Sequence, residues 1–304
     1  MSINQEAVAV WDTIAPEWDA GMGRDGNIYW NVLEKPALER LLHEKRASDA
    51  MPVRALDIST GNGLTARWLV SFLGGDGDTD SNNIEVTATD GSEEMLERAR
   101  RWSSPEADAT PAQRRIRFAK LDVTQPADFD SVLLLSRGLP FDAILMNMAI
   151  MDVPTLEPLA AALPKLLPIG GVFVGSLLHP VFFTPRARRI VEVVNDYDDA
   201  EDGGKTSATA TTLNRAYRLD RYLHVPPWRG FAVPGQARAQ YYFHRPLHEL
   251  FGVFLKTGQL AIDGIEEPAF APEHATQGPP TSSHSTRHFT EFPPIFVFRL
   301  RRIK

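Results

Sequence analysis

The chain has 304 residues, 43% of them hydrophobic, and a formal net charge of −7 at pH 7. This length and apolar content allow a large buried core, while the acidic balance disfavours a nucleic-acid partner. The chain has no cysteine, which excludes disulfides and thiolate chemistry. No apolar stretch is long enough to span a membrane, and the first residues lack the features of a signal peptide, so we expect a cytoplasmic protein without membrane contact.

The first fifty residues predict two helices. Apolar residues at helical spacing indicate a helix over 4–20, with an interruption at Pro16. A glycine-rich loop follows over 21–27, and a second helix is expected from Ile28 to about His43.

A strand, a tight turn and a helix are predicted over residues 53–68. The apolar strand leads into Asp57, and Gly61 and Gly63 allow the backbone to turn sharply before a helix that begins at Leu64. Free N–H groups at a helix start can face a ligand, so the turn predicts a nucleotide-like cofactor site. The turn also fits the dinucleotide pattern G-x-G-x-x-A, but a carboxylate at Asp57 would repel a pyrophosphate and attract a cation.

Further strands complete an alternating α/β pattern. The strand over 84–90 ends in Asp90, whose carboxylate can bind both ribose hydroxyls. The strand over 116–123 contains Asp122 between two apolar residues able to flank an adenine ring. Buried strands are expected over 141–149 and after the glycine pair at 170–171.

The second half of the chain leaves this pattern and then returns to it. Residues 181–244 are rich in aromatic residues, which suit an apolar or aromatic substrate, and 196–212 are expected to form a surface segment. A helix is predicted between Pro246 and Gly258, followed by strands over 260–265 and 294–301.

Four motifs in this order resemble those of class I S-adenosylmethionine-dependent methyltransferases. They are Asp57-x-Ser-x-Gly-x-Gly63, Asp90-Gly-Ser92, Leu121-Asp-Val123 and Leu167-Pro-Ile-Gly-Gly-x-Phe173. The likeness covers roughly residues 53–180, and Ser59 stands where many members have a glycine. The lead-in over 11–38 is similar to a small-molecule branch of the family.

The resemblance implies an α/β fold with a Rossmann-like seven-stranded sheet, one strand of which is antiparallel. It also implies one catalytic unit in three parts: an N-terminal helical lid (1–50), a methyltransferase core (51–180 and 245–304) and a substrate cap inserted after the fifth strand (181–244). The implied cofactor is S-adenosylmethionine, with S-adenosylhomocysteine as product. Its expected contacts are Asp57, Ser59, Gly61, Gly63, Asp90, Gly91, Ser92, Met95, Leu121, Asp122, Val123, Asn147, Met148, Trp18 and Met22.

For the reaction we expect O-methylation of a phenolic or glycosidic hydroxyl on a small molecule, without a metal. A histidine is the usual base near neutral pH, and His179 and His244 are the two candidates at suitable places in the chain. The expected substrate contacts are Asn27, Tyr29, Trp30, Asp152, Trp228 and Arg245. The alternatives are N- or C-methylation, an NAD-dependent oxidoreductase and a non-catalytic cofactor-binding protein. The protein is expected to be a monomer or a homodimer.

Overall fold

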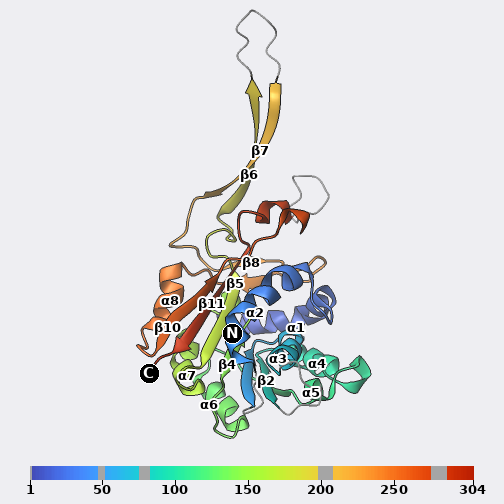
Figure 1. The fold of residues 1–304 in the computed structure, drawn as a ribbon, viewed down its shortest axis with the longest axis vertical. Coiled ribbons are helices and arrows are strands. Elements are labelled where there is room, and N and C mark those ends of the chain that lie inside the picture. Colours follow the sequence, from blue (N-terminus) through green and yellow to red (C-terminus); the bar gives the residue numbers. More distant parts are fainter. Residues whose placement is uncertain (1, 47–51, 75–82, 198–207, 275–285) are drawn as a thin grey trace, which may run out of the picture.

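The protein is built on one mixed sheet with helices on both faces, and a long hairpin projects from one end (Figure 1). The computed structural model describes residues 2–46, 52–74, 83–197, 208–274 and 286–304. None of the helices within those ranges is long and apolar enough to cross a membrane.

The seven strands of the sheet lie in the order β10-β11-β5-β4-β1-β2-β3. Their bounds are β1 (Val53–Ile58), β2 (Ile84–Asp90), β3 (Arg117–Lys120), β4 (Ala143–Met146), β5 (Val172–Leu178), β10 (Leu260–Glu266) and β11 (Ile295–Arg302). Strand β11 is antiparallel to both β5 and β10, and the other pairs are parallel. The predicted Rossmann-like seven-stranded sheet with one antiparallel strand is therefore confirmed.

The helices divide the apolar core into two layers, one on each face of the sheet. The α-helices are α1 (Ile3–Met22), α2 (Lys35–Leu42), α3 (Leu64–Leu73), α4 (Glu93–Trp102), α5 (Pro111–Arg114), α6 (Pro126–Leu135), α7 (Glu157–Leu166) and α8 (Leu247–Leu255). Shorter turns are the π-helix η1 (Trp30–Glu34) and the 3₁₀ turns η2 (His43–Lys45), η3 (Pro105–Ala107), η4 (Ile150–Asp152), η5 (Pro272–His274) and η6 (Thr286–Phe289). Apolar residues of α6, α7 and α8 pack on one face, and those of η1, α2 and α3 pack on the other.

The N-terminal helix differs from its prediction in one respect. Helix α1 runs without interruption from Ile3 to Met22 and contains Pro16, so the expected break at this proline is wrong. Ser2 and Gln5 close its first turn with a capping box, and four apolar side chains on its inner side are buried. These contacts hold the helix ahead of the proline and the buried Asp19 holds it beyond, which offsets the hydrogen bond that proline cannot donate.

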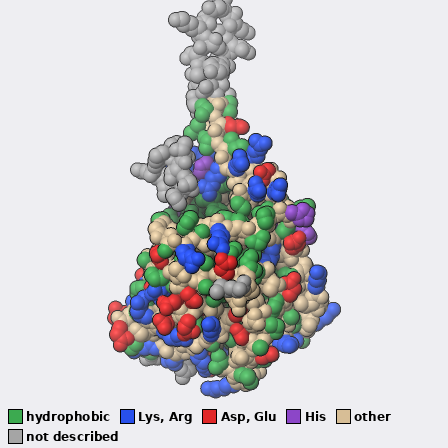
Figure 2. Space-filling view, turned by 180° about the vertical axis from the view of Figure 1, so that it is seen from behind, with side chains coloured by type: hydrophobic (Ala, Val, Ile, Leu, Met, Phe, Trp, Pro, Cys, Tyr) green, Lys and Arg blue, Asp and Glu red, His purple; other side chains and the backbone are tan. Residues whose placement is uncertain are grey.

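The predicted cap consists of two structurally different parts. Strands β6 (Ala187–Tyr197) and β7 (Ala208–Leu219) form the projecting hairpin, so the flanks of the expected surface segment 196–212 are strands, while 198–207 lie outside the described residues. Apolar side chains are exposed on this hairpin and near its junction with the body (Figure 2). Strands β8 (Trp228–Gly230) and β9 (Gln240–Tyr242) instead lie against the body, next to α1.

Candidate active site

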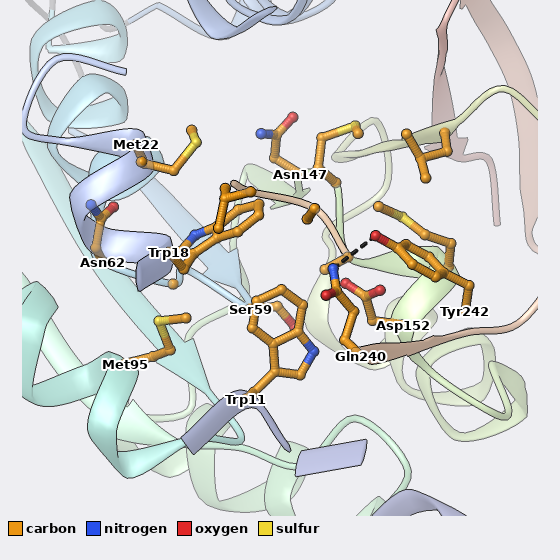
Figure 3. Close-up of a pocket in the computed structure, with 18 of the residues that line it drawn as sticks. Trp11, Trp18, Met22, Ser59, Asn62, Met95, Asn147, Asp152, Gln240 and Tyr242 are labelled. Atoms are coloured by element: carbon orange, nitrogen blue, oxygen red, sulfur yellow. Dashed lines mark hydrogen bonds between the residues drawn. The ribbon is translucent and has the colours of Figure 1, made fainter. Parts of the chain in front are cut away.

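A cavity of about 570 Å³ lies at the carboxyl ends of β1, β2, β4 and β5. This is the edge at which open α/β sheets bind ligands, and the volume is typical of sites for small molecules. Helix α1 forms one wall, and residues 231–234 with β9 form another. The strand ends, the first helix and the cap therefore all contribute residues to the lining of one cavity (Figure 3).

Asp90 is the centre of the wall made by the strand ends. Its Oδ2 accepts a hydrogen bond from the Gly61 N–H at 2.9 Å, and its Oδ1 accepts one from the Ser92 N–H at 2.9 Å. Burial raises the pKa of Asp90 to about 6, although these backbone donors act in the opposite direction. The carboxyl group is thus fixed in orientation and borders the cavity, where it can accept hydrogen bonds from a ligand.

The turn after β1 has an unusual backbone. Gly61 and Gly63 have positive φ angles, as the sequence predicts, and Ser59 has one as well at 57°. Ser59 thus adopts at its position the conformation that glycine takes most readily. Met148, after β4, has a φ of 51° and also lines the cavity. Left-handed non-glycine residues of this kind are concentrated at ligand sites.

Two of the predicted cofactor contacts do not reach the cavity. Asp57 is fully buried under the turn, where its Oδ2 accepts hydrogen bonds from the hydroxyls of Thr60 and Thr65, both at 2.6 Å. Burial raises its pKa to about 7, which is opposite to the charged carboxylate that the sequence argument required. Gly63 packs on α4, since a Cβ atom there would lie 3.0 Å from that of Ala99. Both residues therefore support the turn without bordering the cavity.

The remaining predicted cofactor contacts all line the cavity. They are Ser59, Gly61, Asp90, Gly91, Ser92, Met95, Leu121, Asp122, Val123, Asn147, Met148, Trp18 and Met22. Met95 and Asn62 lie on the side opposite Tyr242 in Figure 3.

The first turns of α1 also belong to this wall, although sequence reasoning began the lid contacts at Trp18. Asn4 donates to Asp122 Oδ2 at 2.8 Å, and Asp12 accepts a hydrogen bond from the Ser92 hydroxyl at 2.6 Å. Trp11 packs edge-on against Trp18, with ring centroids 5.3 Å apart. The helical spacing of Val8 and Trp11 was the available signal for this face.

Asp19 fastens α1 to the glycine turn. Its Oδ1 accepts hydrogen bonds from Asn62 Nδ2 at 2.9 Å and Trp102 Nε1 at 2.7 Å. Its Oδ2 accepts one from Arg101 at 3.0 Å. Only 8% of Asp19 is exposed, so the helix, the turn and α4 are joined through one buried carboxylate.

Glu34, which sequence analysis did not identify, lines the cavity beside Asn147. Its Oε2 accepts a hydrogen bond from Asn147 Nδ2 at 2.8 Å, and Asn147 Oδ1 accepts one from the Ser176 hydroxyl at 2.6 Å. Ser176 in turn accepts from the Met148 N–H at 2.8 Å. Burial raises the pKa of Glu34 to about 7. No local motif marked this residue, because η1 and β4 meet only in the folded chain.

Neither predicted histidine base borders the cavity. His179 is 2% exposed, its Nδ1 accepts the Val181 N–H at 3.1 Å, and its Nε2 lies 2.8 Å from Glu267 Oε1. His244 Nε2 donates to the Tyr222 carbonyl at 2.7 Å and faces a separate cavity of about 20 Å³. Burial lowers the pKa of both histidines. Their ring nitrogens make contacts within the protein, and the catalytic role expected of either histidine stays a prediction.

Half of the predicted substrate contacts line the cavity, and the other half lie behind its wall. Asn27, Tyr29 and Asp152 line the large cavity. Trp30 is 2% exposed and packs on Trp68, while Trp228 stacks on Tyr242 behind the cavity wall, with ring centroids 4.4 Å apart.

Arg245 also lies behind the wall, where it supports the turn that carries Asp152. It donates to the carbonyl of Ile150 at 3.2 Å and to that of Val153 at 2.6 Å. Its role is therefore to hold η4 in place from outside the cavity.

Several acceptor-side residues were missed because they come from distant parts of the chain. They are Phe183, Arg189, Phe231, Ala232, Val233, Pro234, Gln240, Tyr242, Phe289, Pro294 and Ile295. The guanidinium of Arg189 lies 4.5 Å from the ring centroid of Phe289.

Among the described residues, no three histidine, aspartate or glutamate side chains are grouped so that they could hold a metal ion.

Comparison with known proteins identifies the fold. No protein-family model and no curated protein matches the sequence. An S-adenosylmethionine-dependent methyltransferase from Mesorhizobium loti is 21% identical with a TM-score of 0.56, over 92% of this chain and 100% of that one. A chain solved in complex with the Trm112 methyltransferase activator of Haloferax volcanii is 15% identical with a TM-score of 0.54, over 97% and 98%.

The glycopeptide N-methyltransferase MtfA, solved with S-adenosyl-L-homocysteine, is 14% identical with a TM-score of 0.50, over 94% and 96%. At these identities the likeness concerns the fold. The chain has the fold of S-adenosylmethionine-dependent methyltransferases over nearly its whole length.

Proposed function

We propose that the protein is an S-adenosylmethionine-dependent methyltransferase that acts on a small molecule. The observation that carries the proposal is that the Ser59–Gly61 turn, Asp90 and Leu121–Val123 line the same, largely apolar cavity. The fold alone would not suffice, because one fold can host many functions. The shared fold of the M. loti enzyme and of MtfA, which was solved with S-adenosyl-L-homocysteine, supports the same cofactor here.

The residues that line the cavity offer suitable contacts to the ribose, the adenine ring and the methionine moiety of the cofactor. Asp90 would accept hydrogen bonds from the ribose hydroxyls, and Leu121 and Val123 would contact the adenine ring on its apolar faces. Ser59 and Gly61 would hold the methionine moiety. The cavity is lined by four carboxyl groups (Glu34, Asp90, Asp122 and Asp152) and by the guanidinium of Arg189, and this acidic balance suits a cofactor that is cationic at its sulfur.

Bound cofactor would supply an electrophilic methyl group for an in-line displacement. The protein's contribution is to align the acceptor with that methyl group and to exclude water. Helix α1 and residues 231–242 cover the cavity, and we assign them to the proposed lid (1–50) and cap (181–244), with 51–180 and 245–304 as the core. Glu6 joins these covers, since its Oε2 accepts from the Tyr241 hydroxyl at 2.8 Å and its Oε1 from Arg229 at 2.5 Å.

The acceptor atom is the finer part of the proposal. The sequence favours a phenolic or glycosidic hydroxyl with a histidine base, but His179 and His244 both lie away from the cavity. An N-acceptor is the alternative, and the fold neighbour MtfA is named as an N-methyltransferase. The aromatic side chains of Tyr29, Phe183 and Phe289 favour a flat or apolar acceptor in either case.

Isothermal titration with S-adenosylmethionine, S-adenosylhomocysteine and NAD tests the cofactor assignment. We expect micromolar dissociation constants for the first two and no heat from NAD, because the carboxyl groups that line the cavity oppose a pyrophosphate. Binding of NAD alone would reverse the assignment and favour an oxidoreductase. Methyl transfer from labelled cofactor to a panel of phenols, glycosides and amines then separates an enzyme from a non-catalytic binding protein.

A further inference from the structure

Asp152 carries a carboxyl oxygen that has no hydrogen-bond partner among the residues that the structure describes. The residue ends η4, in the loop that follows β4, and lines the cavity. This oxygen, Oδ1, is buried. A buried polar atom without a partner is costly, so its position on a ligand cavity indicates that a ligand provides the donor.

The position of Asp152 is fixed from behind by the backbone around it. Arg245 donates to the carbonyls of Ile150 and Val153, on either side of the residue, and the Phe243 N–H donates to the Met151 carbonyl at 2.6 Å. The guanidinium of Arg245 is therefore committed to carbonyl oxygens. The carboxyl group is held at the wall without a cation of its own.

The polar neighbours of Asp152 are also hydrogen-bonded to other groups. Gln240 Nε2 donates to the Tyr242 hydroxyl at 2.8 Å, and its Oε1 accepts from Gln236. Tyr242 stacks on Trp228, and the negative charge of Asp152 contributes to a raised pKa of the Tyr242 hydroxyl, after the larger effect of burial. Figure 3 draws Asp152, Gln240 and Tyr242 on the same side of the cavity, opposite Met95. Asp152 thus lies on the acceptor side, beside an aromatic surface.

The charge of the cavity limits the donors that can satisfy Asp152. Burial and then the nearby charge of Asp90 raise the pKa of Asp152 well above its usual range. One cofactor has a net charge of about +1, from a sulfonium, an ammonium and a carboxylate. Four carboxyl groups and one guanidinium line the cavity, so a cation bound there would favour the charged carboxylate form of Asp152 over the neutral acid. A cationic donor satisfies both the unpaired oxygen and this charge, whereas a neutral hydroxyl satisfies only the oxygen.

We propose that the methyl acceptor is an amine on an apolar or aromatic molecule, and that Asp152 binds it as an ammonium ion and then takes its proton. The inference rests on the proposed function and specifies its substrate class. An aliphatic amine, like the lysine side chain, has a pKa of about 10.4 and is cationic at neutral pH. It therefore needs a proton acceptor before it can react.

In a primary or secondary amine, one N–H proton of the ammonium ion passes to the Asp152 carboxylate. The carboxylate becomes a neutral acid, and the nitrogen regains its lone pair. The lone pair forms a bond to the methyl carbon, while the carbon–sulfur bond breaks and its electrons go to sulfur. The products are the methylated ammonium ion and S-adenosylhomocysteine.

The first test compares two probes of nearly equal shape, 2-phenylethylamine and 2-phenylethanol, by isothermal titration at pH 7.5. Each is titrated into the wild-type protein with and without saturating S-adenosylhomocysteine. We expect the amine to bind at least ten-fold more tightly than the alcohol. Equal binding, or preference for the alcohol, would overturn the inference while micromolar binding of S-adenosylhomocysteine would leave the proposed function standing. If S-adenosylhomocysteine itself does not bind, both fall.

The second test assigns the preference to Asp152. Asp152→Asn keeps the size of the side chain but removes its charge, so the amine should lose its advantage over the alcohol while S-adenosylhomocysteine binds within about three-fold of wild type. Glu157→Gln is the matched control, because this exposed carboxyl lies nearby on α7 and outside the cavity. Retention of the amine preference in Asp152→Asn would contradict the role of Asp152. The wild-type comparison decides the substrate class even if the variant does not fold.

Discussion

The two sides of the cavity are built in different ways. On the cofactor side, most of the contacts come from three short segments (59–61, 90–95 and 121–123), each at the end of a neighbouring parallel strand. On the acceptor side, Tyr29, Asp152 and Tyr242 come from elements far apart in sequence. The cofactor side is therefore set by the sheet, whereas the acceptor side depends on how the lid and the cap pack on it.

The difference extends to the interactions that hold each side in place. Buried hydrogen bonds to Asp90 and Asp19 fix the cofactor side. The cap is joined to α1 through Glu6, whose ion pair with Arg229 lies at the exposed surface. Exposed ion pairs contribute little to stability, so we expect the acceptor side to be the more adaptable of the two.

The largest expected effect is that of Asp90→Ala on the cofactor side. The change removes the acceptor of two backbone N–H groups and the proposed acceptor of the ribose hydroxyls, so affinity for S-adenosylhomocysteine should fall at least ~100-fold. Titration calorimetry measures this, with Glu93→Gln on the exposed start of α4 as control. Unchanged affinity would remove the ribose assignment and with it the contrast between the two sides.

Asp19→Ala tests whether the lid shares the stability of the cofactor side. Its loss leaves the donors of Asn62 and Trp102 without their acceptor, and we expect the free energy of unfolding to fall by about 3 kcal/mol. Urea denaturation measures the change, and Asp25→Ala, at an exposed position just past α1, is the control. A loss no greater than that of the control would show that α1 is held mainly by its apolar face.

The pH dependence of stability gives a smaller effect. Burial raises the pKa of Glu34 to about 7 from a usual value near 4.5, so the folded protein binds more protons than the unfolded chain between these values. The contribution of Glu34 to the free energy of unfolding therefore falls as pH rises through that window. The lowered pKa values of His179 and His244 act in the opposite direction near pH 6.5.

The Glu34 contribution is isolated by comparing wild type with Glu34→Gln, in which the histidines are unchanged. Between pH 5 and pH 8 the wild type should lose on the order of 2 kcal/mol more than the variant in urea denaturation. Parallel curves for the two proteins would mean that Glu34 titrates near its usual pKa, and that this part of the cavity is more solvated than the structure shows.

The smallest effect on global stability is expected for Glu6→Gln on the acceptor side. The variant weakens the contacts to Arg229 and Tyr241, so hydrogen exchange of backbone amides over 228–242 should become several-fold faster while the unfolding midpoint stays the same. Glu106→Gln, exposed and distant from the cap, serves as control. A clear drop in the unfolding midpoint would show that the cap is part of the cooperative core.

The sequence predicted the fold and most of the cofactor side because both depend on local patterns. An apolar strand followed by a glycine turn places Gly61 and Asp90 at the sheet edge whatever the rest of the chain does. What sequence could not supply was the direction of individual side chains. Asp57 stands one residue from the end of β1, and its carboxyl points beneath the turn toward Thr65.

The acceptor side was predicted poorly for the same physical reason. His179 follows β5 as expected, but hydrogen bonds to its own loop and to Glu267 turn its ring away from the cavity. Glu34 and Gln240 have no motif, and they reach the cavity only because η1 and β9 pack on distant elements. Asp152 was identified because it lies in the loop that follows β4.

The position of β11 in the sheet has a consequence for the order in which the protein can fold during synthesis. Strand β10 leaves the ribosome earlier, yet it meets the sheet only through β11, which lies between it and β5. At about 5–20 residues per second, β10 must wait a few seconds for its partner. During that interval the edge of β5 and the apolar face of α8 are open to other chains, so chaperone binding at this stage would favour a high yield of folded protein.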